Sequence, residues 1–358
     1  MSTTSANTLK LGLIGCGGIV QQIHAPSLLA LRDKIQVTAV ADPNEENRRK
    51  VADLFQVPES ARYADHRDLL ANADVQAVSI ATPHHLHVRQ VTDAAEAKVA
   101  VISEKPMAAT LEDALQIMEA VNKNGIPYAV VHNLLFSLPM RAAHGVLKES
   151  FGTPLFGRSQ SLFRKADDFA TNPNNPGQLW RAQKSSGGGC LIDSCYHEIY
   201  SVESLVGSPI RWVEARVKTA YFGIDVDDLA LLLCEHENGA VSTILSSWFT
   251  AVPDGGRWCE AHGPGGSLRV NHRADDPVRF YSSAEGKWRS VEVPGIHADP
   301  ALVQPRVTGH LGYFEATADA LVAGKTVPVT GAHALHNLAI IEAARKATAD
   351  RRAVEVAH

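Results

Sequence analysis

Short apolar runs alternate with helix-length amphipathic stretches throughout the first 133 residues of the chain. The runs are residues 9–15, 35–42, 75–82, 99–106 and 128–133. Runs of this length and composition are typical of buried strands, and most of the stretches between them are long enough for a helix. The alternation therefore predicts a parallel sheet covered by helices on both faces.

The expected helices carry boundary signals, for example over residues 110–125. Thr110 suits the N-cap, and Gly125 suits the end of the helix. Such a helix can return the chain between two parallel strands, so residues 1–133 are predicted to form one doubly wound α/β domain. The apolar residues expected on its buried face are Leu111, Leu115, Met118 and Val121.

The pattern of residues changes after residue 134. A polar stretch rich in proline and asparagine covers residues 167–178, and three glycines follow at 187–189. Strand-like segments and then helical patterns complete the chain, so residues 134–358 are predicted to form an α+β domain with a mostly antiparallel sheet. The strand-like segments include residues 211–223, 227–249 and 290–295, and the helical patterns cover residues 311–324 and 334–352.

The composition narrows the classes of partner. The 358 residues have a formal net charge of −5 and a pI near 6.3, which gives no basic field for nucleic acid or an anionic membrane. No apolar run reaches the roughly 18 residues of a membrane span. The five cysteines are scattered without a C-x-x-C spacing, so neither disulfides nor a zinc knuckle is indicated. We expect a cytoplasmic protein with a small-molecule partner.

A glycine turn joins the first strand-like run to a helical pattern. Gly15, Gly17, Gly18 and Ile19 stand where a dinucleotide pyrophosphate meets backbone N–H groups at a helix N-terminus. A plain tight turn is the alternative, because Val20 replaces the small residue of the general fingerprint.

The end of the second run bears on the cofactor. Asp42 stands where a carboxylate accepts hydrogen bonds from an adenine ribose. A carboxylate there would repel the 2′-phosphate of NADP. We therefore expect NAD, although Arg48 and Arg49 follow shortly after.

Polar residues also end the third and fourth runs, at the carboxyl edge where open α/β sheets bind ligands. Thr82, His84 and His87 are expected to contact the cofactor or to start a helix. A metal between the two histidines is the weaker alternative, because no further ligand stands nearby. Glu104 and Lys105 end the next run, and Pro106 holds the lysine in extended geometry. A surface lysine is the alternative reading.

The glycines at 187–189 precede a second pair of polar residues. The apolar pattern predicts a helix after the glycines, which would put Asp193 and His197 on one face four residues apart. A carboxylate beside an imidazole suits proton transfer near neutral pH. By spacing alone, an ordinary contact on a helix surface is equally compatible.

Taken together, three segments resemble the Gfo/Idh/MocA family of oxidoreductases, which includes glucose-fructose oxidoreductase and inositol dehydrogenases. The segments are residues 15–26, the Glu-Lys-Pro at 104–106, and the pattern G-G-G-x-x-x-D-x-x-x-H at 187–197. The resemblance covers nearly the whole chain. It implies a Rossmann domain followed by an α/β domain whose open sheet holds substrate against the nicotinamide and builds a homodimer or homotetramer.

The resemblance also implies roles for three residues. Lys105 would orient the substrate hydroxyl and stabilise developing alkoxide charge, His197 would be the general base, and Asp193 would orient it. Hydride would pass directly to the nicotinamide, with no metal needed. Two positions depart from the family pattern: His84 stands where many relatives have Asn, and Tyr200 stands where many have Asp.

The predicted function is NAD-dependent transfer of hydride to or from a secondary alcohol of a sugar, inositol or related polyol. An NAD-dependent glycosidase that oxidises its substrate transiently is one alternative. A non-catalytic NAD or sugar sensor is another, although the chain keeps all three proposed catalytic residues. Candidate substrate contacts are Arg164, Lys165, Trp180, Arg181 and His310.

Overall fold

The computed structural model describes residues 8–172, 179–252, 256–272, 274–295 and 305–357, so part of the polar stretch at 167–178 lies outside the described residues. The chain divides into two compact units. The first combines Met1–Phe136 with Ala301–Leu335, and the second combines Ser137–Pro300 with His336–His358. The sequence-based division placed everything after residue 133 in the second domain, so the two divisions differ over Ala301–Leu335.

The first unit contains a six-stranded parallel sheet in the order β3-β2-β1-β4-β5-β6. The strand order reverses between β1 and β4, as in doubly wound sheets that bind ligands at this point. The predicted Rossmann topology is confirmed; only the two-residue β3, too short to show in an apolar pattern, was not expected. The strands are β1 Leu9–Ile14, β2 Ile35–Ala41, β3 Arg62–Tyr63, β4 Ala77–Ile80, β5 Ala100–Ser103 and β6 Tyr128–Val130.

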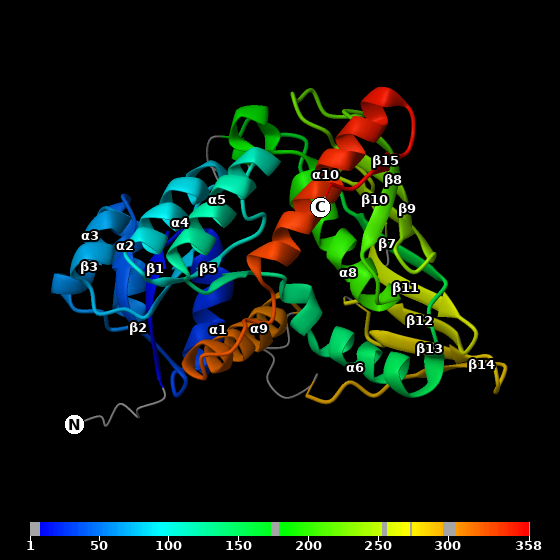
Figure 1. Ribbon diagram of the computed structural model, residues 1–358, viewed down its shortest axis with the longest axis horizontal. Helices are drawn as coiled ribbons and strands as arrows, with labels where there is room; N and C mark the ends of the chain where they lie inside the picture. Colours follow the sequence, from blue (N-terminus) through cyan, green and yellow to red (C-terminus); the bar gives the residue numbers. More distant parts are fainter. Residues whose placement is uncertain (1–7, 173–178, 253–255, 273, 296–304, 358) are drawn as a thin grey trace. The chain divides into compact units, whose positions relative to one another are not determined.

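Helices pack around this sheet. Helix α4 packs against α3 and α5, whereas α1 packs against α9 (Figure 1). The aromatic side chains of Tyr313 and Phe314 are fully buried in the core that also holds Leu11 and Leu13 of β1. This burial explains why α9 belongs to the first unit. The helices are α1 Ala25–Ala30, α2 Glu45–Leu54, α3 His66–Asn72, α4 His87–Glu96, α5 Leu111–Asn124 and α9 Pro305–Val322.

Helix α5 begins and ends as expected. The Thr110 side chain accepts a hydrogen bond from the Asp113 N–H, and Gly125 closes the helix in the left-handed region with φ 65°. The expected buried face was wrong at Leu115, which is 54% exposed. The sequence offers two apolar stripes that share Val121, and the buried one runs through Ala114 and Ile117.

The second unit contains a nine-stranded sheet in the order β14-β13-β12-β11-β7-β10-β9-β8-β15. Every neighbouring pair is antiparallel except β7 and β10, so the predicted mostly antiparallel sheet is confirmed. The strands are β7 Phe156–Leu162, β8 Ile210–Lys218, β9 Leu229–His236, β10 Val241–Ser247, β11 Arg257–Gly263, β12 Gly266–Val270, β13 Val278–Ser282, β14 Lys287–Ser290 and β15 Val354–Glu355.

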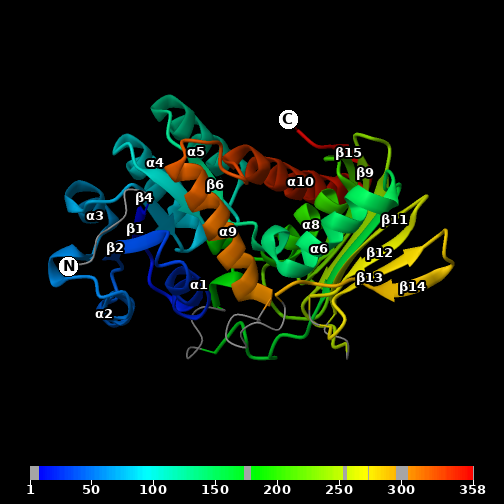
Figure 2. The same cartoon turned by 90° about the horizontal axis from the view of Figure 1, so that it is seen from below.

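Helices α6 Leu138–Val146 and α8 Tyr196–Val206 pack against this sheet (Figure 2). Burial alternates strictly along β9, as expected for a strand with one covered face. The last helix, α10 Gly331–Asp350, begins in the first unit and ends in the second. Among the described residues, no helix combines the length and apolar character needed to cross a membrane.

Candidate functional site

The glycine turn of the first unit combines a strained position with an open one. Gly15 has φ 91°, and a Cβ there would lie 2.8 Å from the Ala81 carbonyl oxygen at the end of β4. A Cβ at Gly17 would meet nothing within 4 Å. Gly15 is therefore required by the fold, whereas Gly17 leaves the turn accessible. Gly18 is similarly open, and Ile19 packs against the core just before a π-helical segment, Val20–His24, that runs into α1.

Asp42 lies beside this turn. Its carboxylate accepts hydrogen bonds from the backbone N–H groups of Cys16, at 2.6 Å, and Asn44, at 2.8 Å. Arg48 Nη1 donates to the Asp42 backbone oxygen at 2.6 Å. Burial, with a smaller contribution from Asp42, raises the pKa of the Cys16 thiol to about 12. The thiol is thus protonated and unreactive at neutral pH, and the turn with its neighbouring carboxylate fits a dinucleotide.

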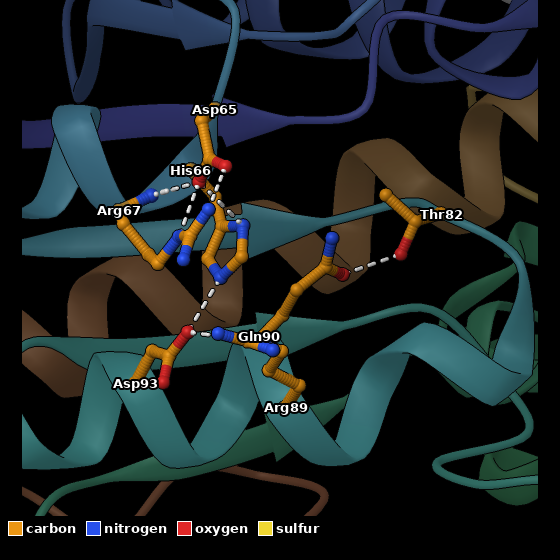
Figure 3. Close-up of polar contacts among 7 residues, drawn as sticks. All are labelled: Asp65, His66, Arg67, Thr82, Arg89, Gln90 and Asp93. Atoms are coloured by element: carbon orange, nitrogen blue, oxygen red, sulfur yellow. Dashed lines mark hydrogen bonds and ion pairs between the residues drawn. The ribbon is translucent and has the colours of Figure 1, made fainter.

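Thr82 and the two nearby histidines lie where β4 leads into α4. Thr82 Oγ1 donates to Gln90 Oε1 of α4 at 2.6 Å (Figure 3). The ring nitrogens of His87 face the backbone oxygens of Met107, at 3.2 Å, and Thr82, at 3.0 Å, and burial lowers its pKa. His87 therefore ties two edge loops together, which disfavours a shared metal with His84. Contact of Thr82, His84 or His87 with a cofactor stays a prediction.

A polar network on the adjacent helices supports the same region. His66 Nε2 lies 2.7 Å from Asp93 Oδ2 of α4, and the Asp65 side chain caps α3 (Figure 3). Hydrogen bonds from Arg67 hold the pKa of Asp65 well below its usual range. This network joins α3 to α4, the helix that carries Gln90, and has a structural role.

A largely buried carboxylate precedes Lys105. Glu104 Oε1 lies 2.7 Å from His24 Nε2 and 3.3 Å from His310 Nε2. Glu104 Oε2 accepts from the Lys105 N–H at 3.1 Å. Burial opposes ionisation of Glu104, but the bonds from His24 and His310 outweigh it and keep the Glu104 pKa well below its usual range. Burial lowers the pKa of His24, so His24 is a neutral donor.

The side chains of His24, Glu104 and His310 are close enough together to be considered as metal ligands, with ligand atoms within 4.8 Å of one another. Both Nε2 atoms, however, face the same carboxylate oxygen at hydrogen-bonding distance. Two N–H donors on one carboxylate account for this geometry, and the expectation that no metal takes part stays a prediction. His310, which was expected to contact substrate, is part of this network.

Lys105 itself is half-buried at the end of β5, and its peptide bond to Pro106 is cis. His132 lies near enough for the lysine charge to affect it. Burial, with smaller contributions from neighbouring charges including Lys105, lowers the His132 pKa to about 3. The imidazole of His132 is therefore neutral and lies near the lysine. The sequence patterns did not single out His132.

In the second unit, the glycine run fixes the start of the helix that carries Asp193 and His197. A Cβ at Gly188 would lie 2.2 Å from the Arg181 carbonyl oxygen, and one at Gly189, where φ is 122°, 2.6 Å from Asp227 Oδ1. Asp227 Oδ2 accepts from the Leu191 N–H at 2.6 Å. No larger residue fits the two glycine positions, and Asp227 caps the helix. The predicted helix is confirmed as a π-helical segment, Leu191–Cys195, followed by α8.

The structure gives Asp193 and His197 partners that the spacing did not reveal. Asp193 Oδ2 lies 3.2 Å from Arg181 Nε, and the Arg181 guanidinium carbon lies 4.3 Å from the centre of the Trp180 ring. His197 Nδ1 lies 2.7 Å from Tyr200 Oη on the same helix. Trp180 and Arg181 thus support the carboxylate, and Tyr200 contacts the imidazole.

Two further candidate residues lie close to aromatic rings. Arg164 Nη2 donates to Asp167 Oδ1 at 2.6 Å and to Tyr221 Oη at 2.8 Å. Lys165 Nζ lies 4.4 Å from the ring centre of the buried Trp248. These are cation–π and ion-pair contacts. A role for either residue in substrate binding stays a prediction.

Comparison with known proteins finds matches to one family in both halves of the chain. Residues 9–132 match the model of an oxidoreductase family with an NAD-binding Rossmann fold. Residues 141–269 match the GFO/IDH/MocA C-terminal domain. The expected family and fold class are thereby confirmed, and NAD binding is supported at the level of the family.

Named relatives and a solved structure are similar over most of the chain. Levoglucosan dehydrogenase of Pseudarthrobacter phenanthrenivorans is 30% identical over 303 residues, which cover 76% of this chain and 75% of the relative. D-apiose dehydrogenase of Rhizobium rhizogenes is 26% identical over 366 residues, covering 97% of each chain. A levoglucosan dehydrogenase in complex with NADH and levoglucosan superposes with a TM-score of 0.83 at 26% identity, covering 98% of this chain and 100% of that one.

Proposed function

The chain belongs to the Gfo/Idh/MocA family of oxidoreductases, and we propose that it transfers hydride between NAD and a secondary alcohol, or the matching ketone, of a sugar, inositol or related polyol. One observation carries the proposal: the chain is similar to sugar dehydrogenases over both units, and Lys105 follows β5 while Asp193 and His197 lie on consecutive helical segments.

The glycine turn and Asp42 form the proposed NAD site. The open space beside Gly17 and Gly18 admits a pyrophosphate to backbone N–H groups, and Asp42 would accept hydrogen bonds from the adenine ribose. The same carboxylate would repel a 2′-phosphate, so NAD is preferred over NADP. Thr82, His84, His87 and Glu104 belong to the proposed cofactor side, where Gln90 and the His24 network hold the edge loops in place.

Each step of alcohol oxidation is assigned to a residue of the chain. His197 takes the proton of the substrate hydroxyl, and the negative charge of Asp193, one helical turn away, stabilises the imidazolium that results. The Lys105 ammonium stabilises the oxygen as it gains negative charge. NAD, when bound, supplies the hydride acceptor. In ketone reduction the same steps run in reverse, and His197 donates the proton.

The substrate side is proposed to include Arg164, Trp180 and His310. The protein is proposed to be cytoplasmic, in keeping with its five buried free thiols. A homodimer or homotetramer is proposed because Leu231 and Leu233 of β9 are exposed on the face of the open sheet opposite to its buried residues.

The test is NADH formation, followed by absorbance, across a panel of monosaccharides, inositols and anhydrosugars. Turnover of at least one of these substrates is expected, with no metal added. Release of a leaving group with no net NADH would instead indicate an NAD-dependent glycosidase. If NAD binds but no substrate is turned over or cleaved, the sensor reading is favoured and the proposed reaction is wrong.

A further inference from the structure

The helix that carries Asp193 and His197 is held at its first turn by a residue from another part of the chain. Asp227 lies in the loop before β9, and it accepts two successive backbone N–H groups of that turn. Its carbonyl oxygen accepts from the Cys190 N–H at 2.8 Å, and its Oδ2 accepts from the Leu191 N–H at 2.6 Å. Cys190 stands at the N-cap position, and cysteine is not among the residues that cap helices well. Asp227 therefore supplies the cap.

Gly189 connects this cap to the proposed catalytic carboxylate. A Cβ at Gly189, where φ is 122°, would lie 2.6 Å from Asp227 Oδ1, so the Asp227 carboxylate occupies the space that another side chain would need. The Gly189 carbonyl oxygen in turn accepts from the Asp193 N–H at 3.0 Å. A shift of Asp227 would therefore reach Asp193 through one intervening residue.

We propose that Asp227 is a positioning residue, which fixes the first turn of this helix and thereby the places of Asp193 and His197. The proposal rests on the proposed function, because a reaction at these two side chains needs their positions held closely. In this role Asp227 acts through the backbone of residues 189–191 and takes no part in the chemistry itself.

The strength of the cap depends on the charge of Asp227. An ionised carboxylate is a stronger acceptor than a neutral carboxyl, and its negative charge is favourable at the start of a helix. Protonation of Asp227 should therefore weaken its bond to the Leu191 N–H and loosen the first turn.

The surroundings of Asp227 place this ionisation in an accessible pH range. Burial and the charge of Asp228 raise the Asp227 pKa to about 6, although a backbone hydrogen bond and the charge of Arg345 on α10 act against them. Two thiols of the helix, Cys190 and Cys195, lie close enough to feel its charge, and burial keeps their pKa values well above the usual range. The carboxyl of Asp227 is thus the group of this set that changes charge in mild acid.

The first test reads the cap directly in the full-length protein. Leucines are labelled with ¹⁵N, ¹H–¹⁵N spectra are recorded on both sides of pH 6, and the Leu191 signal is assigned with a Leu191→Met variant. The amide shift of Leu191 should titrate near pH 6, because its N–H faces the Asp227 carboxylate. In Asp227→Asn this titration should vanish. A flat shift in the unmodified protein, or the same titration in Asp227→Asn, overturns the proposal.

Turnover should follow the same ionisation. Asp227→Asn keeps one accepting oxygen but loses the charge, so it resembles the protonated protein at every pH. The kcat of the unmodified protein should exceed that of Asp227→Asn about fivefold at neutral pH, and the ratio should approach one below pH 6. The titration of His197 is common to both proteins and cancels in the ratio. A ratio that stays constant with pH would contradict the positioning role.

A matched pair of alanine variants separates Asp227 from the rest of its loop. Asp227→Ala should lower kcat about tenfold or more with the Kd for NAD unchanged. Asp225 lies two residues away and accepts from the Lys184 N–H at 3.0 Å, ahead of the glycine run. Asp225→Ala should keep near-native kcat and the titration of Leu191. Equal losses of kcat in the two variants would mean that the loop as a whole supports the helix, and the proposal would be wrong.

The proposed function fails on a different result. If the unmodified protein turns over no sugar or polyol, the proposed reaction is wrong, while the Leu191 titration still decides whether Asp227 caps the helix. If turnover is found and the titration is absent, the proposed function stands and the role of Asp227 is wrong.

Discussion

The Asp42 carboxylate accepts a hydrogen bond from the Cys16 N–H at 2.6 Å, which places the end of β2 against the glycine turn. A negative charge at this point should discriminate between the two nicotinamide dinucleotides. We expect kcat/KM for NAD to exceed that for NADP at least about tenfold, because like charges in contact cost several kcal/mol. Asp42→Ala should weaken the preference, and Asp42→Asn, which removes the charge but keeps one of the two accepting oxygens, should weaken it as well. Equal or better use of NADP by the unmodified protein would refute this assignment.

Replacing Lys105 should affect chemistry more than binding. Lys105→Met keeps much of the side-chain volume but removes the cation, so kcat should fall about 10²-fold or more. Lys123→Met, at an exposed position on α5, is the control and should retain full turnover. Fluorescence titration should give the same Kd for NAD in both variants. Near-native turnover by Lys105→Met would remove the lysine from the catalytic set.

Loss of the proposed base should be equally specific. His197→Ala should lower kcat by about 10²–10⁴-fold while NAD still binds. Asp193→Asn should also lower kcat, because the negative charge that stabilises the imidazolium is lost. His144→Gln replaces a histidine of the second unit that contacts Ser204, and it serves as the control. A His197→Ala variant as active as His144→Gln would exclude His197 as the base.

The exposed face of the second sheet should hold copies of the chain together. Leu231 and Leu233 are 46% and 51% exposed on the same face of β9. Light scattering should show a dimer or tetramer, and a double replacement by glutamate should shift it toward monomer. Leu115→Glu alters an equally exposed leucine of the first unit and should not. A monomer at all micromolar concentrations would contradict the proposed assembly.

Stability should fall in mild acid because buried histidines resist protonation. Burial lowers the pKa of His272 to about 3 from a usual 6.5. Between these values the unfolded chain binds a proton that the folded chain does not, so stability falls as pH falls, by about 1.4 kcal/mol per pH unit for each such group. His272→Asn should flatten the decline of Tm from pH 6.5 to 4. His85→Asn, at an exposed position, should leave the slope unchanged; an identical slope in both variants would contradict this account.

Local features could be predicted from the sequence because neighbouring residues determine them. The cap at Thr110 and the turn at Gly15 follow from side chains and backbone freedom within a few positions. The buried stripe of α5 could not be chosen in the same way, since two stripes are equally periodic and only the packing partner decides between them.

Contacts between distant residues were the part that the sequence could not supply. His24 and His310 meet at Glu104 although they are separated by most of the chain. Arg181 meets Asp193 only because the glycine run folds back between them. Tyr200 was visible as a departure from the family pattern, but its hydrogen bond to His197 depends on the rotamers of two side chains.

The discontinuity of the first unit has a consequence for its synthesis. A chain leaving the ribosome exposes all six strands of the parallel sheet well before α9 is translated, yet Tyr313 and Phe314 of α9 are part of the core beneath that sheet. The N-terminal unit therefore cannot complete its core until α9, which follows most of the second unit in the sequence, has left the ribosome. Until then part of its apolar surface stays exposed, so we expect a fragment ending at Phe136 to be prone to aggregate.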